Sequence, residues 1–509
     1  MTHTNLYAAL RASFPADLGA CAVETDAGLC YSWQDLEDAS AMVANLLEFL
    51  ELPPGARIAV QVEKSVEALI LYLATLRAGL VYLPLNTAYQ SAEMEYFIGD
   101  ARPAVVVCTG PNFGWISRMA FLAGTAHVFT LNEDRTGSLL ERSAQFPRLH
   151  TVANVQATDM AAIIYTSGTT GRSKGAMLSH ANLLSNAQVL QTYWDWRGPA
   201  QGGDVLIHAL PIFHVHGLFV AIHGALINGS KMIWCSKFDP KVVLRYLPVA
   251  TVFMGVPTLY VRLLAEPGLN RDVVRNMRLF ISGSAPLLLE TFNDWQQRTG
   301  HTILERYGMS ETVMLTSNPC RLRDGPRRGG TVGRPLPGVQ LRVRDDSGKV
   351  MPIGEIGGIQ VKGPAVFKGY WKMPEKTAEE FTSDGFFKTG DVGIVDAQGY
   401  VTIVGRSKDL IISGGYNVYP AEIEGYINAM AGVAESAVVG VPDADFGEVG
   451  VAVVIAKPGA ALRGAEILAQ LKATLANFKI PKRCELVSEL PRNAMGKVQK
   501  NLLREQYGK

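Results

Sequence analysis

With 509 residues, the chain is longer than one hydrophobic core normally supports, so we expect at least two domains. A hydrophobic fraction of 48% and a charged fraction of 19% indicate a well-packed protein and argue against disorder. The 48 basic and 47 acidic residues leave a net charge of +1, which argues against nucleic acid or a membrane surface as a partner held by bulk charge.

The six cysteines are scattered and none forms a CxxC pair, so we expect free thiols rather than a zinc site or a disulfide framework. Residues 1–20 lack the apolar core of a signal peptide, and no apolar run approaches the roughly 20 residues of a membrane helix. The last residues do not form a peroxisomal address. These features predict a cytoplasmic protein with no membrane partner.

Short apolar runs alternate with helical patterns over most of the sequence. Val66, Leu69, Ile70, Leu73 and Leu76 recur at helical spacing, and Gly79 then marks the helix end. Repeated strand–helix–strand units predict an α/β fold with largely parallel sheets. The strands are expected at 57–62, 104–108, 204–210, 251–254 and 279–282.

From about Gly333 the sequence becomes rich in glycine and proline, and 339–343 alternates like a half-buried strand. We expect a smaller β-rich layer here. The charged segment 405–409 follows and is predicted to be a linker. The residues after it contain their own strands (437–441, 449–455) and helices (420–430, 464–476), with Pro420 suited to a first helical turn. The predicted domains are therefore 1–405 and 406–509.

The most informative stretch is YTSGTTGRSKG, at 165–175, which follows an apolar strand expected at 160–164. Glycines let backbone N–H groups turn toward phosphates, hydroxyl groups add donors, and Lys174 adds charge. The stretch is not a Walker A loop, because Ser173 stands where that pattern needs glycine and Gly175 where it needs Ser or Thr. A flexible surface turn is the alternative interpretation of this loop alone.

This stretch closely resembles the phosphate-binding signature of the adenylate-forming superfamily, which contains acyl-CoA synthetases, luciferases and adenylation domains. Further segments resemble the superfamily's motifs in the same order, over essentially the whole chain: 210–217 (LPIFHVHG), 282–287 (SGSAPL), 305–312 (ERYGMSET), 332–335 (VGRP), 389–391 (TGD), 405–409 (GRSKD), 413–424 (SGGYNVYPAEIE) and 491–497 (PRNAMGK). The resemblance implies a large multi-sheet N-terminal domain and a small mobile α+β C-terminal domain.

The resemblance also implies a nucleotide site for ATP and Mg²⁺. Asp391 and Arg406 resemble the residues that contact the ribose, Thr312 is expected near the α-phosphate, and Glu311 resembles the Mg²⁺ ligand, with Thr166 beside it. The remaining nucleotide contacts are the phosphate loop (Thr166, Ser167, Gly168, Thr169, Thr170, Lys174), the adenine shelf (Gly283, Ser284, Ala285, Pro286), and Tyr307, Gly308 and Met309, of which Tyr307 stacks on the base.

Lys497 resembles the cation that bridges the attacking carboxylate and the α-phosphate during adenylation, where two anions must meet. Taken alone, it would be an ordinary solvated lysine. Its surroundings also resemble sites of reversible lysine acetylation, which implies an acetyltransferase and a deacetylase as partners. The second half-reaction, with coenzyme A, implies a rotation of the C-terminal domain about Lys408. Gly414, Gly415 and Tyr416 then resemble the loop at the pantetheine channel.

Arg306 narrows the choice of acid. Superfamily members that use monocarboxylates usually have an uncharged residue before the Tyr-Gly step, whereas a guanidinium in an acyl pocket calls for a second carboxylate. His214, His216 and Ser282 lie on segments that border the acyl site, and His214 is also a candidate catalytic residue. The combination resembles malonyl-CoA synthetases, so malonate or methylmalonate is the expected acid. Alternatively, Arg306 points away and pairs with Glu305, and each histidine has a packing or phosphate-side role.

Three other functions remain open at this point. The chain could activate a different short or aryl acid, or it could be a stand-alone adenylation domain that loads a carrier protein. It could also be an inactive nucleotide-binding regulator, although the complete set Lys174, Glu311, Asp391, Arg406 and Lys497 argues against that.

Overall fold

The computed structural model describes residues 4–166, 173–345, 347–413, 416–443, 445–493 and 496–508. Six predicted contacts lie outside the described residues: Ser167, Gly168, Thr169 and Thr170 of the phosphate loop, and Gly414 and Gly415 of the predicted channel loop.

The first layer is a six-stranded sheet in the order β6-β5-β3-β4-β7-β8, parallel except for the β7–β8 pair. The predicted strands at 57–62 and 104–108 are present and pair directly, with Ile58 opposite Val105. Ser65 caps the helix between them by accepting from the backbone N–H of Ala68, and Gly79, at φ +68°, follows its end. The strands are β3 (Arg57–Gln61), β4 (Val81–Pro84), β5 (Val105–Cys108), β6 (His127–Thr130), β7 (Met160–Thr166) and β8 (Lys174–Ser179); the helices are α1 (Leu6–Arg11), α2 (Trp33–Phe49), α3 (Val66–Arg77), α4 (Ser91–Ala101), α5 (Phe113–Leu122) and α6 (Ser138–Ser143).

The second layer is a nine-stranded sheet in the order β15-β14-β13-β12-β11-β9-β10-β1-β2, whose central strands are parallel. It contains the predicted strands at 204–210, 251–254 and 279–282. Its strands are β1 (Cys21–Thr25), β2 (Cys30–Ser32), β9 (Val205–His208), β10 (Lys231–Trp234), β11 (Val252–Gly255), β12 (Leu279–Ser282), β13 (Leu304–Met309), β14 (Val313–Ser317) and β15 (Arg334–Pro335); the helices are α7 (His180–Tyr193), α8 (His223–Leu226), α9 (Pro240–Tyr246), α10 (Pro257–Leu264) and α11 (Leu289–Thr299).

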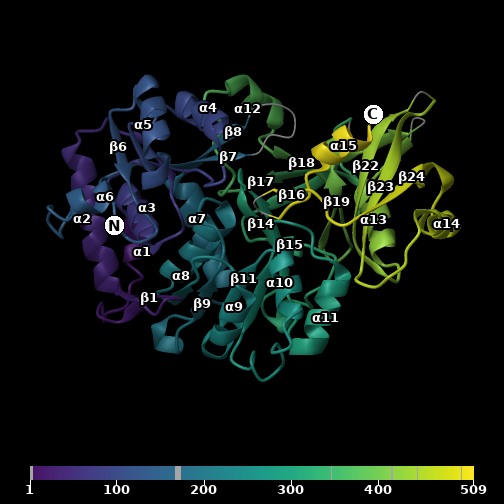
Figure 1. Cartoon of the computed structure of the whole chain (residues 1–509), viewed down its shortest axis with the longest axis horizontal. Coiled ribbons are helices and arrows are strands. Elements are labelled where there is room, and N and C mark those ends of the chain that lie inside the picture. Colours follow the sequence, from purple (N-terminus) through teal and green to yellow (C-terminus); the bar gives the residue numbers. More distant parts are fainter. Residues whose placement is uncertain are drawn as a thin grey trace.

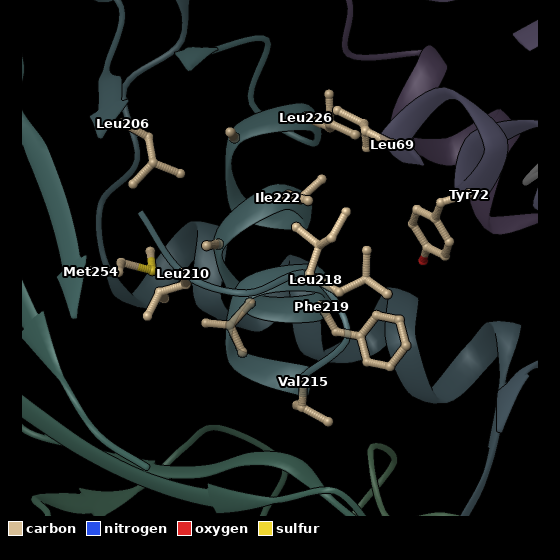
Figure 2. Packing of buried hydrophobic residues seen from close by; sticks show 14 of the residues in the cluster. Leu69, Tyr72, Leu206, Leu210, Val215, Leu218, Phe219, Ile222, Leu226 and Met254 are labelled. Carbon is tan, nitrogen blue, oxygen red and sulfur yellow. The ribbon is translucent and has the colours of Figure 1, made fainter. Parts of the chain in front are cut away.

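The two layers meet at a buried π-helix, η3 (His216–Ile222), which continues into α8. Figure 2 shows Leu206 and Met254 of the nine-stranded sheet on one side of this helix and Leu69 and Tyr72 of α3 on the other. Tyr72 also hydrogen-bonds through Oη to Nε2 of His223, at 2.7 Å. Apolar burial on both sides therefore fixes the segment that begins at His216.

The glycine- and proline-rich region forms a four-stranded antiparallel sheet, in the order β16-β17-β18-β19, as the alternating pattern predicted. Its elements are β16 (Gln340–Arg344), β17 (Gly357–Lys362), α12 (Pro374–Glu380), β18 (Phe387–Val395) and β19 (Val401–Arg406). The short helix η6 (Ser407–Asp409) follows β19 and contains Lys408.

The last part of the chain has a sheet and hydrophobic clusters of its own, on the right of Figure 1. Its helix α13 starts at Pro420, as predicted. The predicted α/β fold with a smaller α+β C-terminal part is confirmed, while the boundary at 405/406 stays a prediction. The elements are β20 (Ile411–Ser413), β21 (Tyr416–Val418), α13 (Pro420–Asn428), β22 (Val433–Asp443), β23 (Gly447–Ala456), α14 (Gly464–Thr474), β24 (Arg483–Val487) and α15 (Lys500–Tyr507).

The expectation of six free thiols was wrong for one pair. Cys21 and Cys30 form a disulfide across the antiparallel strands β1 and β2. The sequence separation of nine residues did not reveal that a tight turn brings the two strands together. Cys108, Cys235, Cys320 and Cys484 are free. No helix within the described residues is long and apolar enough to cross a membrane.

Candidate active site

A cavity of about 470 Å³ lies where the carboxyl ends of parallel strands from both large sheets meet. Crevices at such ends are the usual ligand sites of open α/β sheets. The segments after β3 and β4 line one side of the cavity, and those after β9, β10 and β11 line another. Arg492, Asn493 and Gly496 of the C-terminal part complete it. Phe213 and Gly496, the chain neighbours of His214 and Lys497, are both in the lining.

Arg306 on β13 is buried, with 2% of its surface exposed. Within the described part of the chain, its Nε and Nη2 atoms have no hydrogen-bond partner. Gly283 makes room for the side chain, because a Cβ there would lie 2.5 Å from the guanidinium carbon. Burial lowers the pKa of Arg306 to about 9, so the group is still charged at neutral pH. A buried cation with free donors is costly unless an anion completes it.

The alternative pairing of Arg306 with Glu305 does not occur. Among the described residues no ion pair joins the two side chains, and Glu305 Oε1 instead accepts from the backbone N–H of Leu287 at 3.1 Å. Successive residues of a strand point to opposite faces, which separates the two groups. Burial raises the pKa of Glu305 to about 8, so at neutral pH it is mostly uncharged.

Two histidines and two serines lie near Arg306. Ser284 Oγ and His216 Nδ1 hydrogen-bond at 3.2 Å, while His216 Nε2 and Ser282 Oγ have no partner among the described residues. Burial lowers the pKa of His214 to about 3, with Lys497 and Arg306 adding repulsion. Burial and Arg306 hold the pKa of His216 well below its usual range. Both imidazoles are therefore neutral hydrogen-bonding groups beside a cation.

Lys497 reaches this region from the C-terminal part. Although its side chain keeps access to solvent, the surrounding protein lowers the pKa of its amine to about 8. Arg406 and Arg306 add to that lowering, whereas Asp391 and Glu311 oppose it. The structure therefore brings five charged residues from distant parts of the chain close together: Arg306, Glu311, Asp391, Arg406 and Lys497.

Asp391 and Arg406 face each other across β18 and β19 and form an ion pair, with Arg406 Nε 2.7 Å from Asp391 Oδ1. The Tyr307 hydroxyl donates to the other carboxylate oxygen. Asp391 is only 3% exposed. Burial raises the pKa of this carboxyl group, while Arg406 lowers it. The predicted ribose carboxylate is thus held by two predicted neighbours of the nucleotide.

Glu311 is buried and accepts from the hydroxyl of Tyr370 at 2.9 Å. The ammonium of Lys174 lies 4.3 Å from the centre of the same tyrosine ring and 3.6 Å from Glu380. Tyr370 therefore links the phosphate-side lysine to the predicted metal ligand, and the sequence analysis missed it. The only available signal was an aromatic pair, Tyr370 and Trp371, at the end of a loop.

The other predicted nucleotide contacts lie along the edges of this cluster. Thr312 is buried and its Oγ1 accepts from the N–H of Met309 at 3.3 Å. Gly308 lies against the carbonyl of Val313, where a side chain has no room. Ser284 has a left-handed backbone, at φ +71°. Ala285 is partly exposed and Pro286 is exposed, while Thr166 Oγ1 donates to the carbonyl of Lys174 at 3.3 Å.

Tyr416 is not part of the cluster. It is 59% exposed and stacks on Phe478 within the C-terminal part, with ring centres 4.7 Å apart. Lys408 is also exposed.

Comparison with known proteins agrees with this geometry. The chain is 36% identical over 483 residues to the malonate–CoA ligase of Arabidopsis thaliana, covering 89% of this chain and 78% of that protein. It is 34% identical over 485 residues to a feruloyl-CoA synthase of Amycolatopsis sp, covering 94% and 95%. ATP-bound MatB from Rhodopseudomonas palustris has 54% identity and a TM-score of 0.96, covering 100% of this chain and 99% of that chain. The apo form of that protein gives a TM-score of 0.86.

The family comparison covers both parts of the chain. Residues 13–371 match the AMP-binding enzyme family, and residues 422–497 match the AMP-binding enzyme C-terminal domain. The predicted adenylate-forming superfamily is confirmed: this chain belongs to the AMP-binding enzyme family.

Proposed function

We propose that this protein is an ATP-dependent malonate–CoA ligase, which activates the free dicarboxylic acid as an acyl-adenylate and transfers the acyl group to coenzyme A. The observation that carries the choice of acid is Arg306, a buried guanidinium whose Nε and Nη2 atoms have no hydrogen-bond partner among the described residues. A carboxylate accepts from such a group through two parallel hydrogen bonds. Ser282 Oγ and His216 Nε2, which also lack a partner within the described part of the chain, add further donors for that carboxylate.

In the first half-reaction, an oxygen of the reacting carboxylate attacks the α-phosphorus of ATP and the bond to pyrophosphate breaks. Lys497 offsets the repulsion between the two anions at that point. Asp391 and Arg406 would hold the ribose, and Tyr307 the base. Arg306 would hold the distal carboxylate and leave the other free to attack. No nucleophilic side chain is required.

The residues present fit Mg²⁺. A buried carboxylate, Glu311, has a hydroxyl-bearing residue, Thr166, and a cationic lysine, Lys174, in the same part of the site. Hard cations prefer such oxygen ligands, and one carboxylate suffices where phosphates and water complete the shell. Bound there, Mg²⁺ would neutralise charge on the phosphates. Tyr370 would keep the Glu311 carboxylate in position by donating to Oε1.

In the second half-reaction, the CoA thiol attacks the carbonyl carbon and AMP leaves. We propose that the thiol arm enters through the cavity of about 470 Å³, because its lining adjoins both His214 and Lys497. Lys497 must first withdraw, through rotation of the 406–509 domain about Lys408. Tyr416 would then approach the channel. Lys408→Pro should slow thioester formation more than adenylation, since proline fixes φ at the proposed hinge.

The test is a mass spectrum of the thioesters formed from ATP, CoA and an equimolar mixture of malonate, methylmalonate, succinate, acetate, butyrate and ferulate. Malonyl-CoA as the main product is expected. A main product from a monocarboxylate would favour the alternative acids. Adenylate that accumulates without thioester, in the presence of CoA, would favour the carrier-loading alternative.

Reversible acetylation of Lys497 and a cytoplasmic location belong to the same proposal. Acetylation removes the charge on which adenylation depends. Protein acetylated at Lys497 should therefore lose pyrophosphate release, and a deacetylase should restore it. Full activity after confirmed modification would contradict the assignment. Subcellular fractionation tests the location.

A further inference from the structure

We infer that Lys64 is a positioning residue for the thioester-forming step, because it bridges the two large sheets at the wall of the cavity that the CoA thiol would use. This inference rests on the function proposed above. It concerns a residue outside the acid and nucleotide sites.

Lys64 follows β3 of the six-stranded sheet, and its amine contacts the nine-stranded sheet. Nζ donates to the carbonyl of His208 at 2.8 Å and to the carbonyl of Cys235 at 2.6 Å. These residues end β9 and follow β10, at the carboxyl edge where the cavity opens. The ammonium also lies 4.7 Å from the centre of the Trp234 ring. The Lys64 side chain therefore connects three segments: the one that follows β3, the end of β9 and the segment that follows β10.

The tied segments continue directly into the cavity lining. Residues 209–213 follow His208, and residues 236–238 follow Cys235; both runs line the cavity, as does Lys64. The His208 ring stacks on Trp234 with centres 4.7 Å apart, and His208 Nε2 hydrogen-bonds to the carbonyl of Gly217 at 3.0 Å. Loss of the amine would release both carbonyls and the stacked pair, and so change the width of the channel.

The acid site has a second anchor, besides the contact between His208 and Gly217. His216 is held by Ser284 from the other side, and η3 is packed between the sheets. Lys64 should therefore act on CoA more than on the acid. A residue with a merely structural role would instead affect both half-reactions, or stability alone.

The experiment compares Lys64→Met, which keeps length but loses the donors, with Lys64→Arg, which keeps donors. Lys231→Met is the matched control, because Lys231 begins β10 at the opposite end of the strand and pairs with Glu24. Malonate-dependent ATP–pyrophosphate exchange reports adenylation, and CoA titration reports the second step. Loss of two hydrogen bonds should raise the KM for CoA roughly tenfold or more in Lys64→Met.

Exchange should stay within about threefold of wild type in Lys64→Met, and Lys64→Arg should recover most of the CoA affinity. Lys231→Met should behave like wild type in both assays. An unchanged KM for CoA in a folded Lys64→Met, or equal losses in both half-reactions, would overturn the inference. The proposed function fails separately, if the wild-type enzyme makes no malonyl-CoA.

A measurement on the wild-type protein covers the case in which Lys64→Met does not fold. Burial lowers the pKa of Lys64 to about 7, so part of its amine is unprotonated and reactive at that pH. Limited acetylation by acetic anhydride, read by peptide mass spectrometry, should modify Lys64 less in the presence of AMP and saturating desulfo-CoA. Lys231 should be modified equally with and without these ligands. Equal modification of Lys64 under both conditions would overturn the inference.

Discussion

Arg306 and Lys497 act on opposite ends of the same small acid in the proposed reaction. Both groups are cations whose pKa values the surrounding protein lowers, Arg306 to about 9 and Lys497 to about 8. Asp391 and Glu311 partly compensate at Lys497. Without substrate, the two cations repel each other. A dianionic acid is therefore the ligand that would neutralise both charges.

Arg306→Leu should change the acid that the enzyme accepts. Stranding one member of a buried charge pair costs about 2–5 kcal/mol, so kcat/KM for malonate should fall by roughly 30- to several-thousand-fold. Activity with propionate or butyrate should rise, because no unpaired cation then faces a methyl end. The KM for ATP should stay at the wild-type value. Arg321→Leu, at a partly exposed arginine, is the control. A loss with malonate below about threefold would refute the dicarboxylate assignment and leave the family unaffected.

Adenylation should lose rate as pH rises through about 8. A lysine is charged below its pKa, and the pKa of Lys497 in the free enzyme is lowered to about 8, so kcat/KM for the exchange reaction should decline above that pH. Lys497→Arg should remove this decline, since a guanidinium stays charged. The pKa of Glu305 is raised to about 8 and that of Arg306 is lowered to about 9, so a decline that persists in Lys497→Arg would assign it to one of these two groups instead.

Among elements, the turn after β12 and the strand β13 fit together because one glycine leaves room for one arginine. A Cβ on Gly283 would clash with the Arg306 guanidinium, at 2.5 Å from Cζ. The turn also contains Ser284, whose left-handed backbone aims its hydroxyl at His216. The shelf expected to support adenine therefore also shapes the acid site.

Gly283→Ala should displace the Arg306 guanidinium and lower kcat/KM for malonate by about tenfold or more, since an overpacked site must shift the arginine or the turn. Gly425→Ala in α13 is the control, because a Cβ there meets open space. Thermal unfolding distinguishes local displacement from global loss. A Gly283→Ala enzyme with wild-type malonate kinetics would show that the guanidinium adjusts freely.

For the whole molecule, the two parts are arranged so that Lys497 faces Asp391, Glu311 and Arg406 of the predicted nucleotide site. An ion pair between two exposed side chains crosses between them: Lys457, just after β23, contacts Glu290 at the start of α11. Gly496 lies close to Thr258 of α10 in the same interface.

Reversal of either charge, Glu290→Lys or Lys457→Glu, should slow adenylation relative to thioester formation. An exposed pair contributes about 0.2–1 kcal/mol, so the ratio should change by up to roughly fivefold, and less at high salt. The double variant, Glu290→Lys with Lys457→Glu, should restore the wild-type ratio. Asp38→Lys, which breaks the Arg148 pair within the N-terminal part, should leave the ratio unchanged. A ratio unaffected by single reversals would show that this contact does not bias the domain arrangement.

The sequence by itself determined the α/β class, the family and most of the charged site, because hydrophobic periodicity and contiguous motifs are local properties of the chain. It also predicted that Arg306 selects the acid. Tertiary structure decided what depends on distant segments. Those features are the burial of Arg306 without a hydrogen-bond partner for Nε or Nη2 in the described ranges, the raised pKa of Glu305, the Tyr370 contact to Glu311, and the bridge from Lys64 to two strand ends. The Cys21–Cys30 disulfide belongs with them. Spacing along a chain cannot give these contacts, since each arises only when separate strands pack at one edge.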